Sequence, residues 1–183
     1  MQDDATAGNK VGNRRDETAG LRWALGYDHA GFRLASQLAE YLTSAQHFVT
    51  HFGPLNDLES VDYVPFCIAA ATEVAAARAD FGIVIGGSGQ GEQMAANKVR
   101  GIRAALCTDA HFALLARRDN DANVLALPGR MMAKEYAEQI VEIWTDTKFA
   151  GGRHLRRLGQ IALYEKGELQ FPQVGTSRGK EIT

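Results

Sequence analysis

The sequence predicts an α/β protein built on a doubly wound, five-stranded parallel sheet with helices on both faces. Short apolar segments alternate along the chain with longer segments of helical character. The apolar segments are hydrophobic almost throughout, as in strands that are buried on both faces of a parallel sheet. The chain has 183 residues, 45% of them hydrophobic, which is enough for one domain with a sizeable core. Together these observations are typical of a Rossmann-like fold.

Each strand is assigned from an apolar run, and each helix from the mixed apolar and polar segment that follows it. The first strand, LRWALGY (21–27), precedes a helix at about 31–45, and the second, HFVTHF (47–52), precedes a helix at about 63–78. The third strand, FGIVIG (81–86), leads into a short helix at 92–98, and the fourth, IRAALC (102–107), into a helix at 109–118. The fifth, NVLALP (123–128), is followed by a helix at 133–146 and a C-terminal helix near 153–165.

The composition predicts a single domain over residues 21–166, between a disordered N-terminal tail (1–20) and a loosely ordered C-terminal tail (167–183), because both ends are poor in apolar residues. A formal net charge of −2 gives no reason to expect a nucleic acid or a membrane as partner. No apolar run spans a bilayer and no secretory signal pattern is present, so a cytoplasmic location is expected. Cys67 and Cys107 lie in apolar segments and are expected to be reduced core residues. No Cys/His grouping has zinc-ligand spacing, and neither a metal nor another cofactor is expected.

In a doubly wound sheet, ligands bind beyond the carboxyl ends of the strands. Four segments follow strands in this chain: YDHAGF (27–32), GGSGQGEQ (86–93), CTDAHF (107–112) and PGRMM (128–132). The candidate functional residues are concentrated in these segments.

The glycine-rich segment 86–93 raises the question of what it holds. It lacks the Gly-Lys-Ser/Thr of a triphosphate-binding loop, and a carboxylate at Glu92 would repel a diphosphate, so a nucleotide-binding module is disfavoured. The backbone N–H groups from Gly87 through Gly89 to Gly91 can form a concave nest that stabilises an oxyanion, and Ser88 adds a hydroxyl.

Glu92 lies at the start of the predicted helix, where the helix dipole favours an ionised carboxylate, and is a candidate general base. A base beside an oxyanion-binding nest can remove a proton next to a carbonyl. The alternative is that Glu92 is an ordinary first-turn residue of the helix.

Six blocks in order carry a family resemblance: DHAGF (28–32), VDYVPF (61–66), GGSGQGEQMAANKV (86–99), GIRAALC (101–107), DNDANVLALPGR (119–130) and GGRHLRR (151–157). From about Leu21 to Tyr164, the chain resembles ribose-5-phosphate isomerase B and the galactose-6-phosphate isomerase subunits. The resemblance implies a Rossmann-like homodimer, or a tetramer, that interconverts aldose and ketose phosphates without metal through a cis-enediol. Ribose 5-phosphate and ribulose 5-phosphate are the substrates that it favours.

The resemblance also implies roles for individual residues. Many relatives have a catalytic cysteine where this chain has Gly86, whereas a second branch has a glutamate six positions later, which Glu92 matches. In that branch Glu92 shuttles the proton between C1 and C2, and Ser88 and the loop amides stabilise the enediolate. The residues implied in phosphate binding are His29, Arg130, Arg153, His154 and Arg157, and those implied in contacts with the sugar hydroxyls are Asp28, Tyr63 and Asn120. Tyr63 could equally be a core aromatic. The resemblance places the site between two subunits, so that some of the arginines act across the interface.

The match fails at Asp119, where most relatives have a histidine that opens the furanose ring. Aspartate has an ordinary pKa of about 4 and is a poor acid at neutral pH unless its surroundings raise it. His111 lies roughly 12 Å earlier along the same helix and is too distant to substitute. Either Asp119 has a raised pKa and opens the ring, or the substrate needs no opening.

A change of substrate would explain the missing histidine. Erythrose 4-phosphate and erythrulose 4-phosphate cannot close a furanose ring, because O4 carries the phosphate. An isomerase of such a four-carbon phosphate or of a hexose 6-phosphate is therefore an alternative. A non-catalytic sugar-phosphate-binding subunit is an alternative of another class.

Overall fold

The computed structural model describes residues 20–172 and confirms an α/β fold with a five-stranded, all-parallel sheet. The strands are β1 (Arg22–Tyr27), β2 (Phe48–Phe52), β3 (Phe81–Gly86), β4 (Ala104–Leu106) and β5 (Val124–Pro128). The helices are α1 (Phe32–Ser44), α2 (Tyr63–Ala75), α3 (Gln90–Ala96), α4 (Ala110–Asn120), α5 (Lys134–Asp146) and α6 (Arg153–Lys166). Of the predicted tails, 1–20 and 167–183, residues 1–19 and 173–183 lie outside the described residues.

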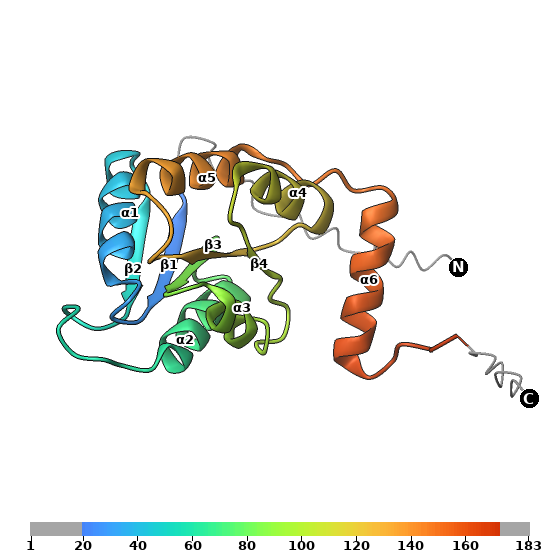
Figure 1. Ribbon diagram of the computed structural model, residues 1–183. Coiled ribbons are helices and arrows are strands. Elements are labelled where there is room, and N and C mark those ends of the chain that lie inside the picture. The colour runs from blue at the N-terminus through green and yellow to red at the C-terminus, as the bar shows by residue number, and fades with distance from the viewer. Residues whose placement is uncertain (1–19, 173–183) are drawn as a thin grey trace, which may run out of the picture.

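Two layers of helices cover the sheet: α1, α4 and α5 pack on one face, and α2 and α3 pack on the other (Figure 1). The first face holds the larger side chains, among them the fully buried Trp23, Leu38 and Trp144. The second core is rich in alanine, so α2 approaches the sheet closely. A Cβ at Gly26 would come within 2.8 Å of the Phe66 carbonyl, and a larger residue would push α2 away from β1.

β2 is less buried than the sequence predicts. Three of its five residues are exposed, Phe48 among them at 66%, and the other two are half-buried. In contrast, β1, β3 and β5 are buried almost throughout. The expectation of strands covered on both faces is therefore wrong for β2. The strand order β2-β1-β3-β5-β4 explains the difference, because β2 lies at an edge of the sheet.

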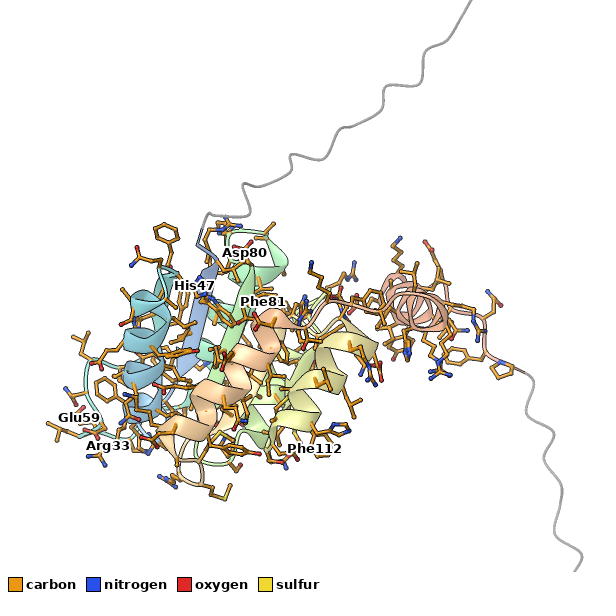
Figure 2. The ribbon with its side chains drawn as sticks, turned by 90° about the horizontal axis from the view of Figure 1, so that it is seen from above. Arg33, His47, Glu59, Asp80, Phe81 and Phe112 are labelled. Atoms are coloured by element: carbon orange, nitrogen blue, oxygen red, sulfur yellow. The ribbon has the colours of Figure 1, made fainter. Side chains whose placement is uncertain are left out.

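α6 stands apart from the rest of the molecule (Figures 1 and 2). None of its residues is buried, and Leu155, Ile161 and Tyr164 expose large apolar side chains. Gly151 and Gly152 precede it with φ of 65° and 58°, a left-handed conformation that side chains disfavour, and they turn the chain away from α5. Within residues 20–172, neither α6 nor any other helix is long and apolar enough to cross a membrane.

The topology brings the loops after β1, β3 and β5 together at the carboxyl edge of the sheet. From β1 the chain moves outward to β2, and from β3 it moves to the other side, so β1 and β3 form a switch point of the kind where ligands bind. The Gly129 N–H donates to the Gly86 carbonyl at 2.8 Å, and the Arg130 N–H donates to the Gly87 carbonyl at 3.2 Å. These bonds fix the loop after β5 against the glycine-rich loop after β3.

Candidate active site

An open pocket of about 520 Å³ lies at this switch point. It is lined by Asp28, Tyr63, Gly87, Ser88, Gly91, Glu92, Arg130 and Met131. Seven of these eight were predicted as site residues, and they come from four separate segments of the chain. Met131 was not predicted as a site residue, although it belongs to the PGRMM segment, which follows the carboxyl end of the fifth strand, where ligands are expected.

Glu92 is almost completely buried, with only 4% of its surface exposed. Burial raises the pKa of its carboxyl group, and the nearby charge of Asp28 raises that pKa further. Hydrogen bonds from the backbone of Glu92 itself and of Gly89 oppose the shift without cancelling it. The helix start thus favours the ionised form, as predicted, but burial outweighs this effect. A carboxylate with a raised pKa is suited both to accept a proton and to return it.

Gly86 leaves the space that the Glu92 carboxylate fills. A Cβ at position 86 would lie 1.8 Å from Glu92 Oε1 and 2.3 Å from its Cδ. Any side chain at position 86 would therefore compete with the carboxylate for the same volume. Gly86, which ends β3, and the buried Glu92 in the first turn of α3 therefore form one structural unit.

Asp28 and His29 are held in place by backbone hydrogen bonds. The Asp28 Oδ1 atom accepts from the N–H groups of Ala30 and Gly31, both at 2.9 Å. His29 Nδ1 accepts from the Val61 N–H at 3.2 Å and therefore carries no proton in this arrangement. Nδ1 also lies 4.0 Å from Asp28 Oδ2, so Nε2 is the ring nitrogen that these contacts leave for a ligand.

Tyr63 and Arg130 flank the glycine-rich loop. A Cβ at Gly91 would lie 2.4 Å from Tyr63 Oη, so the hydroxyl sits against the first turn of α3 while the ring packs against the alanine-rich core. A Cβ at Gly87 would lie 3.5 Å from Arg130 Nη1, which places the guanidinium over the loop. Both residues occupy the pocket that the family resemblance implies for them.

Cys67 lies in the interior near the pocket and is free and fully buried, as is Cys107. Burial raises the pKa of the Cys67 thiol far above its usual range, and the charges of Glu92 and Asp28 add to the effect. The thiol therefore stays protonated, and both cysteines are reduced core residues, as predicted.

The remaining predicted site residues form a second group at the other edge of the sheet. Asp119 and Asn120 end α4, which runs from the carboxyl end of β4 back toward the amino end of β5. His154 Nε2 lies 3.7 Å from Asp119 Oδ1, and the Arg153 Nε–H donates to His154 Nε2 at 3.4 Å. Arg157 is exposed one turn further along α6. Asp119, Asn120, Arg153, His154 and Arg157 are called the α4–α6 cluster below.

Asp119 is an ionised carboxylate in this cluster. It accepts hydrogen bonds from Arg118 Nε at 2.8 Å and Nη2 at 3.1 Å. These bonds lower its pKa, and the charges of His154 and Arg153 lower it further. The suggestion that Asp119 opens the sugar ring by means of a raised pKa is therefore wrong for this arrangement.

Within one chain the two groups do not meet. None of the α4–α6 cluster lines the Glu92 pocket, and Asn120 instead lines a groove of about 380 Å³ beside β4 and α6. The groove is largely apolar, with Ile102, Leu158 and Ile161 among its lining residues. This separation was not predicted from the sequence, because it depends on the direction of α4 and on the turn of the chain that precedes α6.

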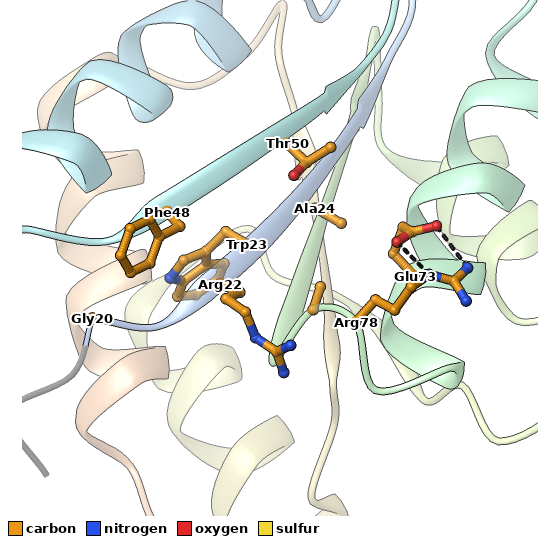
Figure 3. A pocket seen from close by; sticks show the side chains of 9 residues that line it. Gly20, Arg22, Trp23, Ala24, Phe48, Thr50, Glu73 and Arg78 are labelled. Carbon is orange, nitrogen blue, oxygen red and sulfur yellow. Dashed lines mark hydrogen bonds and ion pairs between the residues drawn. The ribbon is translucent and has the colours of Figure 1, made fainter. Parts of the chain in front are cut away.

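A further cavity of about 520 Å³ lies at the amino edge of β1 and β2 (Figure 3). Its charged side chains are already paired, Arg78 with Glu73 at 2.8 Å and Arg22 with Asp80 at 3.1 Å. It contains none of the predicted site residues. Among the described residues, no three His, Cys, Asp or Glu side chains are grouped so that they could hold a metal ion.

Comparison with known proteins agrees with this geometry. A family model described as Ribose/Galactose Isomerase matches residues 23–161. The chain belongs to this family. Membership makes it an enzyme of the aldose–ketose isomerase class.

Relatives in the Ribose/Galactose Isomerase family match over most of their length. The chain is 42% identical to ribose-5-phosphate isomerase B of Mycobacterium tuberculosis over 149 residues, which is 81% of this chain and 92% of the relative. It is 38% identical to ribose-5-phosphate isomerase B of Escherichia coli, over 78% of this chain and 95% of the relative.

Solved structures show the same similarity. Ribose-5-phosphate isomerase B of Clostridium thermocellum superimposes with a TM-score of 0.78 at 42% identity, covering 80% of this chain and 99% of that one. The enzyme of Mycoplasma genitalium, solved with bound ribulose 5-phosphate, gives a TM-score of 0.76 at 38% identity over 79% of this chain and 96% of that one.

Proposed function

We propose that this protein interconverts ribose 5-phosphate and ribulose 5-phosphate, with Glu92 as the base. The observation that carries the proposal is the buried Glu92 carboxylate, with its raised pKa, in a pocket beside the glycine-rich loop. The relatives' names and the complex of the Mycoplasma genitalium enzyme with ribulose 5-phosphate support the choice of substrate. A cytoplasmic location fits such a reaction.

In the proposed mechanism, the Glu92 carboxylate takes the proton from C2 of the open-chain aldose. The electron pair of the C2–H bond forms the C1–C2 double bond, and the charge passes to the former carbonyl oxygen. Backbone N–H groups of the glycine-rich loop and the Ser88 hydroxyl stabilise this enediolate. The protonated Glu92 then delivers the proton to C1, and a proton moves between O2 and O1 to complete the ketose. No step calls for a metal, so EDTA is expected to leave the rate unchanged.

Replacing Glu92 by glutamine tests the base directly. Loss of a general base costs about 10²–10⁴-fold in kcat, and the amide fills the same space, so KM should change little. Turnover is followed by NMR with ribose 5-phosphate, and binding of inorganic phosphate is measured in parallel. If Glu92→Gln keeps most of the wild-type kcat, Glu92 is not the base.

We further propose that the active site is completed by a second copy of the chain. The cationic α4–α6 cluster lies away from Glu92 in one chain, and α6 projects with exposed apolar side chains. In a symmetric dimer, α6 of one subunit can bring Arg153 and Arg157 to the pocket of the other, where their planar guanidinium groups suit a phosphate. Arg130 would bind the substrate from within the pocket, and His29, which follows the pocket residue Asp28 in sequence, would bind it from beside the pocket.

A four-carbon sugar phosphate is a second candidate substrate. Arg118 keeps Asp119 ionised, so Asp119 is a poor acid for opening a ring, and a tetrose 4-phosphate needs no opening. The ratio of kcat/KM for erythrose 4-phosphate and ribose 5-phosphate decides between them. A clear preference for the tetrose would assign the change at position 119 to a change of substrate.

A further inference from the structure

His154 and Asp119 come together from two different helices. His154 is the second residue of α6, Asp119 is the last but one of α4, and His154 Nε2 lies 3.7 Å from Asp119 Oδ1. Their side chains are 15% and 25% exposed, so both are partly enclosed yet accessible. The sequence suggested only His111 as a neighbouring histidine, and that residue is exposed two helical turns away.

The proposed reaction needs a group that moves a proton before Glu92 can act. Ribose 5-phosphate in water is a furanose, whose C1 carries a hydroxyl and the ring oxygen O4 in place of a carbonyl. Opening it transfers the O1 hydroxyl proton to O4 while the C1–O4 bond breaks and the C1=O1 bond forms. An imidazole with a free nitrogen can carry this proton, because its ordinary pKa lies near neutrality.

We propose that His154 is the residue that opens the ring, held and charge-stabilised by Asp119. This inference rests on the proposed isomerisation and on the completion of the Glu92 pocket by a second subunit. It gives His154 a role other than the phosphate contact that the family resemblance implies.

The geometry fits a proton transfer in which one nitrogen, Nε2 of His154, takes the proton from O1 and returns it to O4. Nε2 of His154 accepts from the Arg153 Nε–H at 3.4 Å, so its lone pair is occupied by a side chain, whereas that of His29 Nδ1 is occupied by the backbone. When Arg153 turns to the phosphate, the O1 hydroxyl can take its place and give its proton to Nε2. The electron pair of the C1–O4 bond passes to O4, and the imidazolium returns the proton to O4. The imidazole begins and ends neutral.

Asp119 stabilises the charged intermediate of this shuttle. Its carboxylate is fixed by two hydrogen bonds from Arg118 and lies beside the nitrogen that gains the proton. A carboxylate in this position holds the ring in orientation and lies beside the atom on which the positive charge develops during the transfer.

His29 is the competing histidine. It follows Asp28 in sequence but does not itself line the Glu92 pocket, and its Nδ1 accepts from the backbone N–H of Val61 at 3.2 Å. In that arrangement His29 can donate a hydrogen bond but has no free nitrogen to take a proton. It is therefore suited to binding and not to the shuttle.

The test measures initial rates at increasing enzyme concentration in both directions. Without enzymatic ring opening, only the free aldehyde is converted, so the forward rate of His154→Asn should level off at the rate of spontaneous opening, measured by NMR exchange between the anomers. Ribulose 5-phosphate cannot close a furanose, because O5 carries the phosphate, so the reverse rate should stay proportional to enzyme. The rates of wild type and of the control His111→Asn should be proportional to enzyme in both directions. The forward rate of Asp119→Asn should keep rising with enzyme, but with a smaller slope than that of wild type.

Three outcomes would overturn the inference. A His154→Asn rate that is lower but proportional to enzyme in both directions would assign His154 to phosphate binding or structure. An unchanged rate would exclude it from the reaction, and a plateau for His29→Asn instead would move ring opening to His29. The variant's mass in solution is measured alongside to confirm that subunit association is intact. If wild type converts neither sugar, the proposed function itself fails, which this comparison separates from failure at His154.

Discussion

Glu92, the residue proposed as the base, is also expected to reduce the stability of the fold. Its pKa is raised above the ordinary value of 4.5, so the folded state binds the proton more tightly than the unfolded state. Stability therefore falls as pH rises from the unfolded pKa through the folded one. Glu92→Gln should raise Tm relative to wild type at pH 7–8, and the difference should vanish below about pH 4.5. Thermal unfolding across this pH range checks it, with exposed Glu40→Gln as the control that should show no such gain.

The raised pKa of Glu92 also predicts the pH at which activity falls in acid. Only the ionised carboxylate can accept the C2 proton, so kcat/KM should fall as pH drops through the raised pKa of Glu92, with a midpoint above 4.5. A midpoint at or below this ordinary value would mean that burial does not control the base.

Gly86 allows a steric test of the same carboxylate. Gly86→Ala should displace it, because the new Cβ would lie 1.8 Å from Oε1, and kcat should fall by about tenfold or more. Gly82→Ala is the matched control in the same strand, where the Cβ would meet Val124 and Val74 at 3.1 and 3.2 Å, far from the pocket. The control should lose some thermal stability but keep its turnover. Equal losses of turnover in both variants would point to general damage to β3.

At the scale of elements, α6 exposes apolar side chains that the rest of the described chain leaves uncovered. Ile161→Asp places a charge on the exposed apolar side of α6, at the groove beside β4. We expect the variant to remain folded, because α6 contributes no buried residue, but to lose association and activity. Light scattering after size exclusion should give the 19.9 kDa of one chain, whereas Gln160→Asp on the same helix should keep the wild-type mass. An Ile161→Asp variant that still associates would exclude this side of α6 from the interface.

The sequence pattern predicted the positions of the elements well, because apolar runs and helical segments report local preference. β3 was predicted at its observed limits, and α1 and α6 within one residue. β4 is shorter than predicted, since the backbone N–H of Arg103 donates to the side chain of Asn123 at 2.8 Å and not to a neighbouring strand. The exposure of β2 could not be predicted in the same way, because it depends on strand order, which no local pattern encodes.

At the scale of the molecule, the pocket was predictable but the separation of the site into two groups was not. Asp28, Ser88, Glu92 and Arg130 could be predicted to lie together, because all four follow parallel strands whose carboxyl ends lie at one edge of the sheet. The contact between Asp119 and His154 depends instead on the turn at Gly151 and Gly152, which sets the course of α6. The glycine pair is visible in the sequence, but the direction it gives the chain is not.

Mixing two inactive variants tests whether each site is shared. Co-expressed Glu92→Gln and Arg157→Ala chains should form hybrid dimers in which one of the two sites has both residues intact. With random pairing, about a quarter of all sites are then functional, which kcat/KM at low substrate should reveal. Glu92→Gln mixed with Gly86→Ala is the control, since both changes affect the same half of the site and no hybrid is intact. Failure of the first pair to regain activity would place the whole site within one chain.

The volume shared by positions 86 and 92 also restricts how this enzyme can evolve. A mutation that adds a side chain at position 86, the last residue of β3, would displace the Glu92 carboxylate. With Glu92 as the proposed base, a lineage taking that step would lose the reaction before any replacement base existed. Passage to a different base must run through a small residue at position 92 first, or through both changes at once. Laboratory evolution from this sequence should therefore recover side chains at position 86 only in chains that have already given up Glu92.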